Sequence, residues 1–170
     1  IANSSNLGTF VTFADDTNIF VEGASIEEAY EKGNRLLCAI KNYMTLNKLH
    51  INMSKCSYIH FTPQANKCQE VNDTPGLYID SFPVKKTKST KFLGVIIDED
   101  LSWQPHITAL RRKLNYAAAT LNRIKDSVPS YLHKDLYHTL FESHLTYCIF
   151  VWGDAANFRT ASLWLAQKIA

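Results

Sequence analysis

The sequence has little glycine, proline and cysteine, and each shortage excludes a class of protein. Its 170 residues include six glycines, five prolines and four cysteines. So little glycine and proline excludes a collagen-like chain. With 46% hydrophobic and 20% charged residues, the chain does not fit the coiled-coil or disordered classes either. Its length predicts one domain, or one lobe with part of another, and is sufficient to bury a core.

Long hydrophobic runs are also missing. No apolar stretch reaches the roughly 18 residues that a transmembrane helix requires, so we expect no membrane partner. The first ten residues lack the basic start and apolar centre of a secretory signal. The first methionine is Met44 and the C-terminal residues stop within a hydrophobic pattern, so we expect a piece of a longer protein.

The cysteines are too few and too scattered to indicate a disulfide framework or a zinc site. No Cys-x-x-Cys spacing is present, and disulfide-rich domains contain far more cysteine. We therefore expect reduced, partly buried thiols in an intracellular protein, with nucleus and cytoplasm both open. The four residues are Cys38, Cys56, Cys68 and Cys148.

Charge is distributed unevenly along the chain, although the net charge is only +2. The segment from Lys85 to Lys134 holds ten basic and four acidic residues, a balance of +6. The remainder holds eight basic and twelve acidic residues, a balance of −4. This asymmetry favours metal or acid chemistry in the front half and polyanion binding in the back half. A solvated basic face without a ligand is the alternative.

The first hundred residues combine strand and helix signals. Two β-prone runs, 10–13 and 18–21, flank two acidic residues and predict a hairpin with those acids at its tip. A capping box from Ser25 to Glu28, followed by apolar residues at helical spacing, predicts a helix over 26–48. We also expect strands at 58–61 and 91–97, a loop over 63–76, and a short hairpin formed by 77–80 and 82–84.

After residue 102 the hydrophobic period becomes that of helices. One apolar stripe from Ile107 to Val128 predicts a helix that Pro129 ends. A second stripe predicts a helix over 132–152, and a third helix is expected near Ala161. The predicted fold class is therefore α+β, with antiparallel strands and a packed helix over residues 1–101 and an all-helical part over 102–170.

Asp15 and Asp16 are the residues most suited to chemistry. Two carboxylates at a tight turn repel each other unless a cation lies between them. Mg²⁺ is bound by a few such oxygens together with substrate phosphates. Pairs of these ions activate the attacking oxygen and stabilise the leaving oxygen in phosphoryl transfer. A solvated hairpin turn is the alternative, because an Asp-Asp pair alone is not specific.

Four segments, in this order, resemble non-LTR (LINE-type) retrotransposon reverse transcriptases. Residues 13–16 (FADD) are similar to the aromatic-x-Asp-Asp box of reverse transcriptases. Residues 49–56 (LHINMSKC) are similar to a Leu-x-Ile-Asn-x-x-Lys segment. Residues 91–107 (from KFLGVIID to LSWQPHI) resemble the family's junction between a hairpin and the thumb, and 145–153 resemble its thumb. Each segment is weak alone, but the ordered set indicates this family.

The resemblance implies a partial polymerase palm over residues 1–101 and a truncated helical thumb over 102–170. Asp15 would be a metal ligand and Asp16 a supporting carboxylate, for Mg²⁺ or Mn²⁺. Lys55 matches the lysine that protonates the departing pyrophosphate, and an ordinary surface lysine is the alternative. Asn52 is expected to shape that turn. The implied primer and template contacts are Phe92, Leu93, Gly94, Arg111, Arg112, Lys113 and Arg123.

The basic residues after Ser102 suit a phosphate-tracking helix. At 100° per residue, Arg112 and Arg123 lie opposite the apolar stripe, and Arg111 and Lys113 flank it. No acidic residue lies between Trp103 and Lys125. Such a face favours sequence-independent duplex binding, and a solvated face is the alternative. We expect His106, His133, His138 and His144 to be surface or interface residues.

The implied reaction is RNA-templated addition of deoxynucleotides to a primer 3′-hydroxyl with two Mg²⁺ ions. The partners would be an RNA template, a DNA primer, deoxynucleoside triphosphates and the N-terminal remainder of the same polyprotein. A further catalytic Asp of the family lies upstream, so we expect this chain to be inactive alone. The alternative is a non-catalytic nucleic-acid-binding relic. An RNA-dependent RNA polymerase is disfavoured, because its usual glycine before the acids is Ala14 here.

Overall fold

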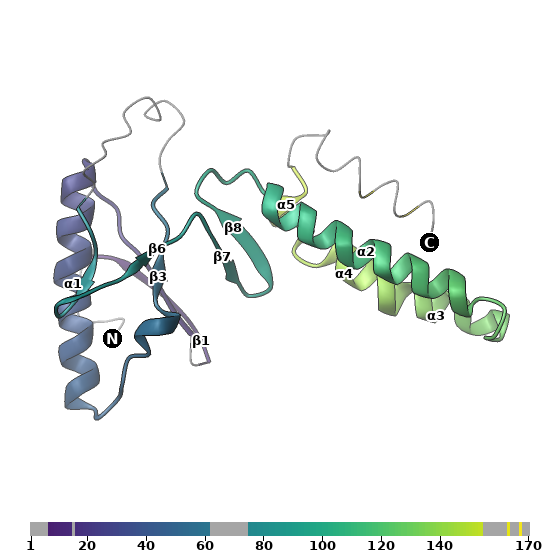
Figure 1. Cartoon of the computed structure of the whole chain (residues 1–170), viewed down its shortest axis with the longest axis horizontal. Coiled ribbons are helices and arrows are strands. Elements are labelled where there is room, and N and C mark those ends of the chain that lie inside the picture. Colours follow the sequence, from purple (N-terminus) through teal and green to yellow (C-terminus); the bar gives the residue numbers. More distant parts are fainter. Residues whose placement is uncertain (1–6, 15, 62–74, 155–162, 164–166, 168–170) are drawn as a thin grey trace. The chain divides into compact units, whose positions relative to one another are not determined.

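A computed structural model describes residues 7–14, 16–61, 75–154, 163 and 167 (Figure 1). The chain forms two compact units, residues 1–58 with 65–87 and residues 59–64 with 88–170. It combines helices with two-stranded sheets, and the helices after Gln104 follow one another without strands, which confirms the predicted α+β class. In the described part of the chain, no helix is long and apolar enough to cross a membrane.

The first unit opens with the predicted hairpin. β1 (Thr9–Phe13) and β2 (Asp16–Phe20) pair antiparallel, with Phe13 opposite Asp16. This register leaves a two-residue loop, and Ala14 in that loop has φ 51°, in the left-handed region that tight hairpin loops require.

α1 (Ile26–Leu46) confirms the predicted helix, and its start is capped as the sequence indicates. The Glu28 N–H donates to Ser25 Oγ at 3.2 Å. The Glu28 carboxylate in turn accepts the N–H of Ala24 at 2.7 Å, one residue earlier than in a standard capping box. Tyr30, Leu36 and Ile40 are buried and form the inner face of the helix.

Short strands pack beside α1. The side-chain amide of Asn34 donates to the Gly76 carbonyl at 3.1 Å and accepts the Tyr78 N–H at 2.9 Å, which fixes this segment to the helix. The predicted hairpin over 77–84 is confirmed, but one strand pair, β3 with β6, is parallel where we predicted antiparallel strands. The strands are β3 (Ser57–Tyr58), β4 (Tyr78–Ile79), β5 (Phe82–Pro83) and β6 (Lys85–Lys86). The predicted strand over 58–61 is therefore shorter, and most of the predicted loop 63–76 lies outside the described residues.

The second unit begins with a hairpin where we predicted one strand. β7 (Ser89–Phe92) and β8 (Val95–Asp98) pair antiparallel around a two-residue turn. Leu93 and Gly94 form that turn with φ 45° and 87°. Two consecutive left-handed residues reverse the chain, so the apolar run over 91–97 folds back on itself. The hairpin belongs to the same compact unit as the helices that follow.

α2 (Gln104–Ile124) supplies most of the core of this unit. It ends four residues before the predicted Val128, so Pro129 does not terminate it. Its apolar stripe is buried as predicted, and Leu114 and Phe141 of the same core cluster are both completely buried. The core residues are Ile107, Leu110, Leu114, Ala117, Ala118, Leu121, Phe141, Trp152 and Leu163.

The chain after α2 is divided into short helices, where we predicted one helix over 132–152. Tyr147 and Cys148 interrupt it, and Cys148 has φ 52°, which no right-handed helix accommodates. The elements are η3 (Ser130–Leu132), α3 (His133–Tyr137), the π-helical η4 (His138–Glu142), α4 (Ser143–Thr146) and α5 (Ile149–Trp152). The helix predicted near Ala161 lies outside the described residues.

Candidate nucleic-acid interface

The acidic hairpin lies in the first unit. Asp16 is the first residue of β2 and its side chain is exposed, beside the exposed Phe13 that it faces across the strand pair. Asp15 lies outside the described residues. One carboxylate, the type of ligand that Mg²⁺ prefers, therefore lies at the end of the hairpin.

The described residues do not complete a metal centre around Asp16. Across the ranges that the structure describes, no three His, Cys, Asp or Glu side chains lie close enough together to hold an ion. Mg²⁺ is held by one or two protein carboxylates only when substrate phosphates and water supply the other ligands. The roles of Asp15 and Asp16 stay predictions.

Lys55 ends a turn that Asn52 organises, as predicted. Residues Met53–Lys55 form the short 3₁₀ helix η1. The Asn52 side-chain oxygen accepts the Ser54 N–H at 3.2 Å and the Ser54 hydroxyl at 2.7 Å, which caps the helix. Lys55 is exposed at its end. The turn presents the lysine to solvent, and its role as a proton donor stays a prediction.

The predicted primer contacts form the turn between β7 and β8. Phe92 is half-buried, while Leu93 and Gly94 are exposed. Gly94 has a left-handed φ of 87°, which favours glycine, and a Cβ there would also make a tight contact, 3.1 Å from the Tyr147 ring. Gly94 leaves its half of the turn without a side chain, so the exposed backbone there allows close approach of another molecule, beside the exposed Leu93 side chain.

Tyr147 holds this turn, a function that the sequence interpretation did not assign to it. Its hydroxyl donates to the Leu93 carbonyl at 2.6 Å, across 54 positions of sequence. Its own carbonyl accepts the Trp152 Nε1–H at 2.9 Å. The hairpin turn is thus attached to the break between α4 and α5. In the sequence, the only signal for Tyr147 is that it lies within 145–153, the segment that resembles the thumb of the family.

Asp98 joins the same hairpin to α2. Its carboxylate accepts the N–H groups of Ser102 at 3.0 Å and Trp103 at 2.9 Å. Burial acts to raise the pKa of Asp98, but hydrogen bonds from Ser102 and Trp103 outweigh it and hold the pKa below its ordinary value of 3.8. The charged carboxylate therefore satisfies two backbone N–H groups just before α2 begins.

His106 is buried within its own chain, so the prediction that it is a surface or interface residue was wrong. It is 7% exposed, and its ring lies 5.5 Å from that of Trp152. Its Nδ1 accepts the Ile96 N–H at 3.4 Å, while Nε2 is buried without a partner in the described part of the chain. Burial lowers the pKa of His106 below its ordinary 6.5, and the nearby Lys113 charge lowers it further.

Acid is expected to destabilise the fold through His106. Protonation would place a proton on the Nδ1 that accepts the Ile96 N–H, so the folded state favours neutral imidazole. Because the folded pKa is lowered, this stability is present above pH 6.5 and is lost as the pH falls through the folded pKa. His106→Gln is expected to reduce the fall in urea midpoint between pH 7 and 5. His144→Gln, an exposed histidine, is the control; an equal effect of both would contradict the prediction.

The other three histidines predicted to be surface or interface residues, His133, His138 and His144, are exposed, and His133 and His138 have specific partners. His133 Nε2 lies 2.9 Å from the Lys125 carbonyl and 3.0 Å from the Val128 carbonyl, so its N–H satisfies acceptors beyond the end of α2. His138 pairs with Glu142 one helical turn away.

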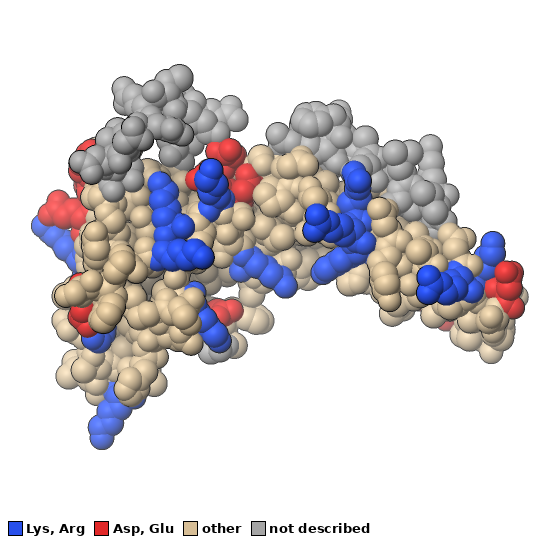
Figure 2. Space-filling model, viewed as in Figure 1, with Lys and Arg blue, Asp and Glu red and all other residues tan. Residues whose placement is uncertain are grey.

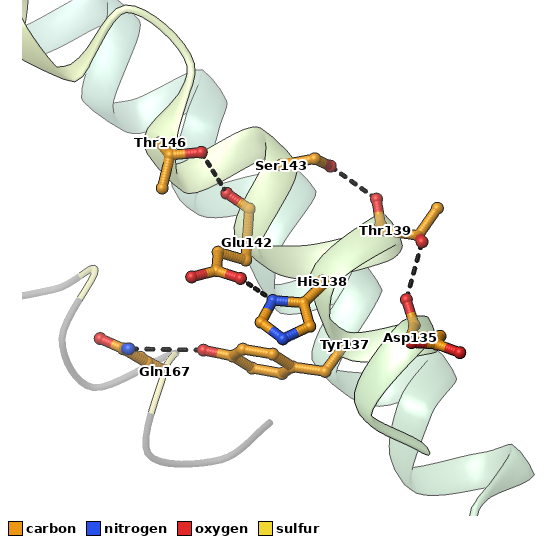
Figure 3. A network of polar contacts seen from close by, with 8 residues as sticks. All are labelled: Asp135, Tyr137, His138, Thr139, Glu142, Ser143, Thr146 and Gln167. Carbon is orange, nitrogen blue, oxygen red and sulfur yellow. Dashed lines mark hydrogen bonds and ion pairs between the residues drawn. The ribbon is translucent and has the colours of Figure 1, made fainter. Parts of the chain in front are cut away.

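The pair of His138 and Glu142 belongs to a network along η4 (Figure 3). The hydroxyls of Thr139, Ser143 and Thr146 each donate to the carbonyl four residues earlier, at 2.7, 2.5 and 2.9 Å. Such bonds compete for helix carbonyls and bend helices. The network is structural and accompanies the π-helical segment His138–Glu142.

The four predicted phosphate contacts are on α2 and are all exposed. In the described ranges none of the four makes an ion pair with an acidic side chain. Figure 2 shows basic side chains over the first part of α2 and again towards its end, with no acidic side chain between them. The four residues are Arg111, Arg112, Lys113 and Arg123. Their charge is therefore available to an anionic partner.

Comparison with known proteins identifies relatives among mobile-element polymerases. The chain is 29% identical over 153 residues to the RNA-directed DNA polymerase from mobile element jockey of Drosophila funebris. It is 23% identical over 149 residues to the Drosophila melanogaster protein of that name. It is 24% identical over 151 residues to the probable RNA-directed DNA polymerase from transposon X-element of Drosophila melanogaster.

These matches confirm the resemblance predicted from the sequence. Each covers 86% of this chain, and the chain spans only 16% of the length of each relative. No family profile and no solved structure matches the chain. The chain is thus related to one segment of the RNA-directed DNA polymerases of non-LTR retrotransposons.

Proposed function

We propose that the chain is the C-terminal half of the palm and the thumb of a non-LTR retrotransposon reverse transcriptase. The main support for this proposal is the match over 86% of the chain to proteins named RNA-directed DNA polymerases. Palm function lies in residues 1–101 and thumb function in 102–170. The partners are an RNA template, a DNA primer, deoxynucleoside triphosphates and the remainder of the same polyprotein, within the cell.

The acidic hairpin and the lysine turn provide the chemical groups of the palm. Asp15 and Asp16 contribute carboxylates for Mg²⁺ or Mn²⁺. Two such ions, when bound, would activate the attacking 3′-hydroxyl and stabilise the negative charge on the leaving oxygen. Lys55, exposed at the end of η1, donates a proton to the departing pyrophosphate and offsets its charge. One hairpin of carboxylates is too few for a two-ion site, so the 170-residue chain alone is inactive.

The hairpin turn and α2 bind the template–primer duplex. Phe92, Leu93 and Gly94 meet the primer end, where the exposed backbone at Gly94 permits a close approach. The basic side chains of α2 contact phosphates, which positions the duplex without selecting its sequence. Because Tyr147 and Asp98 attach the turn to the helices, the primer contact and the phosphate contacts belong to one compact unit.

The phosphate contacts can be tested on the 170-residue chain itself. Arg112→Gln with Arg123→Gln is expected to weaken binding of an RNA–DNA duplex at low salt. Removing one side chain that neutralises a phosphate reduces the slope of log affinity against log salt by about 0.9, so the slope of the double variant should be shallower by roughly one to two units. Fluorescence anisotropy from low to moderate salt measures both quantities.

A matched control separates local charge from net charge. Lys32→Gln with Arg35→Gln removes two positive charges from α1, where they pair with Glu28 and Glu31. Glutamine preserves helix propensity in both double variants, so folding should survive. An unchanged slope for the α2 variant, or an equal change in the α1 control, would show that α2 does not contact phosphates.

A further inference from the structure

The exposed face of α2 carries an aromatic side chain, Tyr116, between Arg112 and Arg123. Arg112, Tyr116, Ala119 and Arg123 follow at intervals of four, three and four residues, which places them on one stripe of the helix. All four are exposed, and Tyr116 is 78% exposed. The stripe lies opposite the buried one centred on Leu114, so none of its side chains contributes to the core.

Tyr116 is not one of the residues that form or pack against the core of its unit. A largely exposed phenol on a helix contributes little to packing, and tyrosine is a poorer helix former than alanine or arginine. No hydrogen bond to its hydroxyl is present in the described part of the chain; only its backbone carbonyl accepts one, from Thr120 at 2.9 Å. The hydroxyl is free to donate to and accept from a bound molecule.

The surroundings of Tyr116 indicate an anionic partner with hydroxyl groups. The helix has no acidic residue along its length, and Figure 2 shows basic side chains on both sides of its middle. At 1.5 Å per residue, Arg112 lies about 6 Å and Arg123 about 10 Å from Tyr116 along the axis. Ala119 leaves room beside the ring for a backbone to approach.

We propose that this stripe recognises the RNA strand of a duplex, with Tyr116 as the residue that senses its 2′-hydroxyls. In A-form duplexes the minor groove is wide and shallow and displays the 2′-hydroxyls between the two backbones. A helix lying across it puts an arginine on each backbone and the tyrosine hydroxyl on the groove floor. The arginines meet the same phosphate charge in RNA and DNA, so recognition of the 2′-hydroxyl is assigned to Tyr116. The inference rests on the proposed function and adds a preference for RNA-containing duplexes.

The test compares two duplexes of one sequence, an RNA–DNA hybrid and a DNA duplex, on the whole 170-residue chain. The chain is expected to bind the hybrid more tightly. Tyr116→Phe removes only the hydroxyl, so hybrid affinity should fall about 3- to 10-fold, towards that of the DNA duplex, as expected when one hydrogen bond is removed. The DNA affinity and both salt slopes should stay unchanged, because the charge is the same.

Tyr131→Phe is the control, since Tyr131 is 76% exposed in the same unit but lies outside α2. An unchanged hybrid-to-DNA ratio for Tyr116→Phe overturns the inference alone and leaves a protein surface as the alternative partner of the stripe. An equal fall on both duplexes also overturns it. If the unaltered chain binds neither duplex, the phosphate contacts of the proposed function fail as well.

Discussion

In the proposed full-length polymerase, replacing Asp15 by Asn should abolish RNA-templated primer extension. The amide has nearly the same shape but lacks the charge that holds divalent cations, which carry much of the rate in phosphoryl transfer. Extension of a labelled DNA primer on an RNA template, with Mg²⁺ and then Mn²⁺, measures the effect. We expect incorporation to fall to background with either ion, while duplex affinity stays unchanged.

A second aspartate on a hairpin turn provides the control for Asp15. Asp80 lies between β4 and β5 and pairs with Lys41 at the surface, an interaction that contributes little to stability. Asp80→Asn should leave extension almost unchanged. Substantial incorporation by the Asp15 variant, or by the unaltered 170-residue chain alone, would contradict the proposed role of the acidic hairpin.

The elements that could be predicted are those whose signals are local. Ser25 and Glu28 lie within one turn of the helix that they cap, and the apolar period that follows defines its buried face. The hairpin around Ala14 needs only two β-prone runs and a short polar turn between them. Asn52 similarly caps a turn two residues away. In each case cause and consequence lie within a few residues.

The elements that could not be predicted depend on distant residues. The run from Lys91 to Ile97 has the composition of one buried strand, yet it turns at Leu93 and Gly94. Gly94 lies against the Tyr147 ring and the Leu93 carbonyl accepts its hydroxyl, interactions across more than 50 positions that no local pattern contains. The break at Cys148 has the same origin, since it presents Tyr147 to the hairpin.

The candidate site divides in the same way. Asp16, Lys55 and the basic residues of α2 could be selected from motifs and helical spacing. Tyr147 acts through a tertiary hydrogen bond, and an exposed tyrosine such as Tyr116 has no sequence signature of its own. His106 lies just inside the start of α2, where its position on the helix does not reveal the hairpin and Trp152 that cover it.

Lys55→Ala in the same polymerase should slow nucleotide addition about 10²- to 10⁴-fold, the usual contribution of a general acid, and leave duplex binding nearly unchanged. Lys55 is exposed at the end of η1, and Asn52 holds the turn through Ser54 rather than through the lysine. The fold should therefore tolerate the change. Single-turnover incorporation measures the rate, and anisotropy on the same duplex measures binding.

Lys55→Arg distinguishes the two effects that a cation could have at this position. Arginine retains the charge that offsets the pyrophosphate but does not release a proton near neutral pH. If proton donation dominates, the Arg variant is nearly as slow as the Ala variant; if charge dominates, it recovers most of the rate. Lys48→Ala, an exposed lysine that follows α1, should change neither rate nor affinity. Equal reductions of rate and binding in Lys55→Ala would make Lys55 a surface contact and leave the proton on the pyrophosphate to another donor.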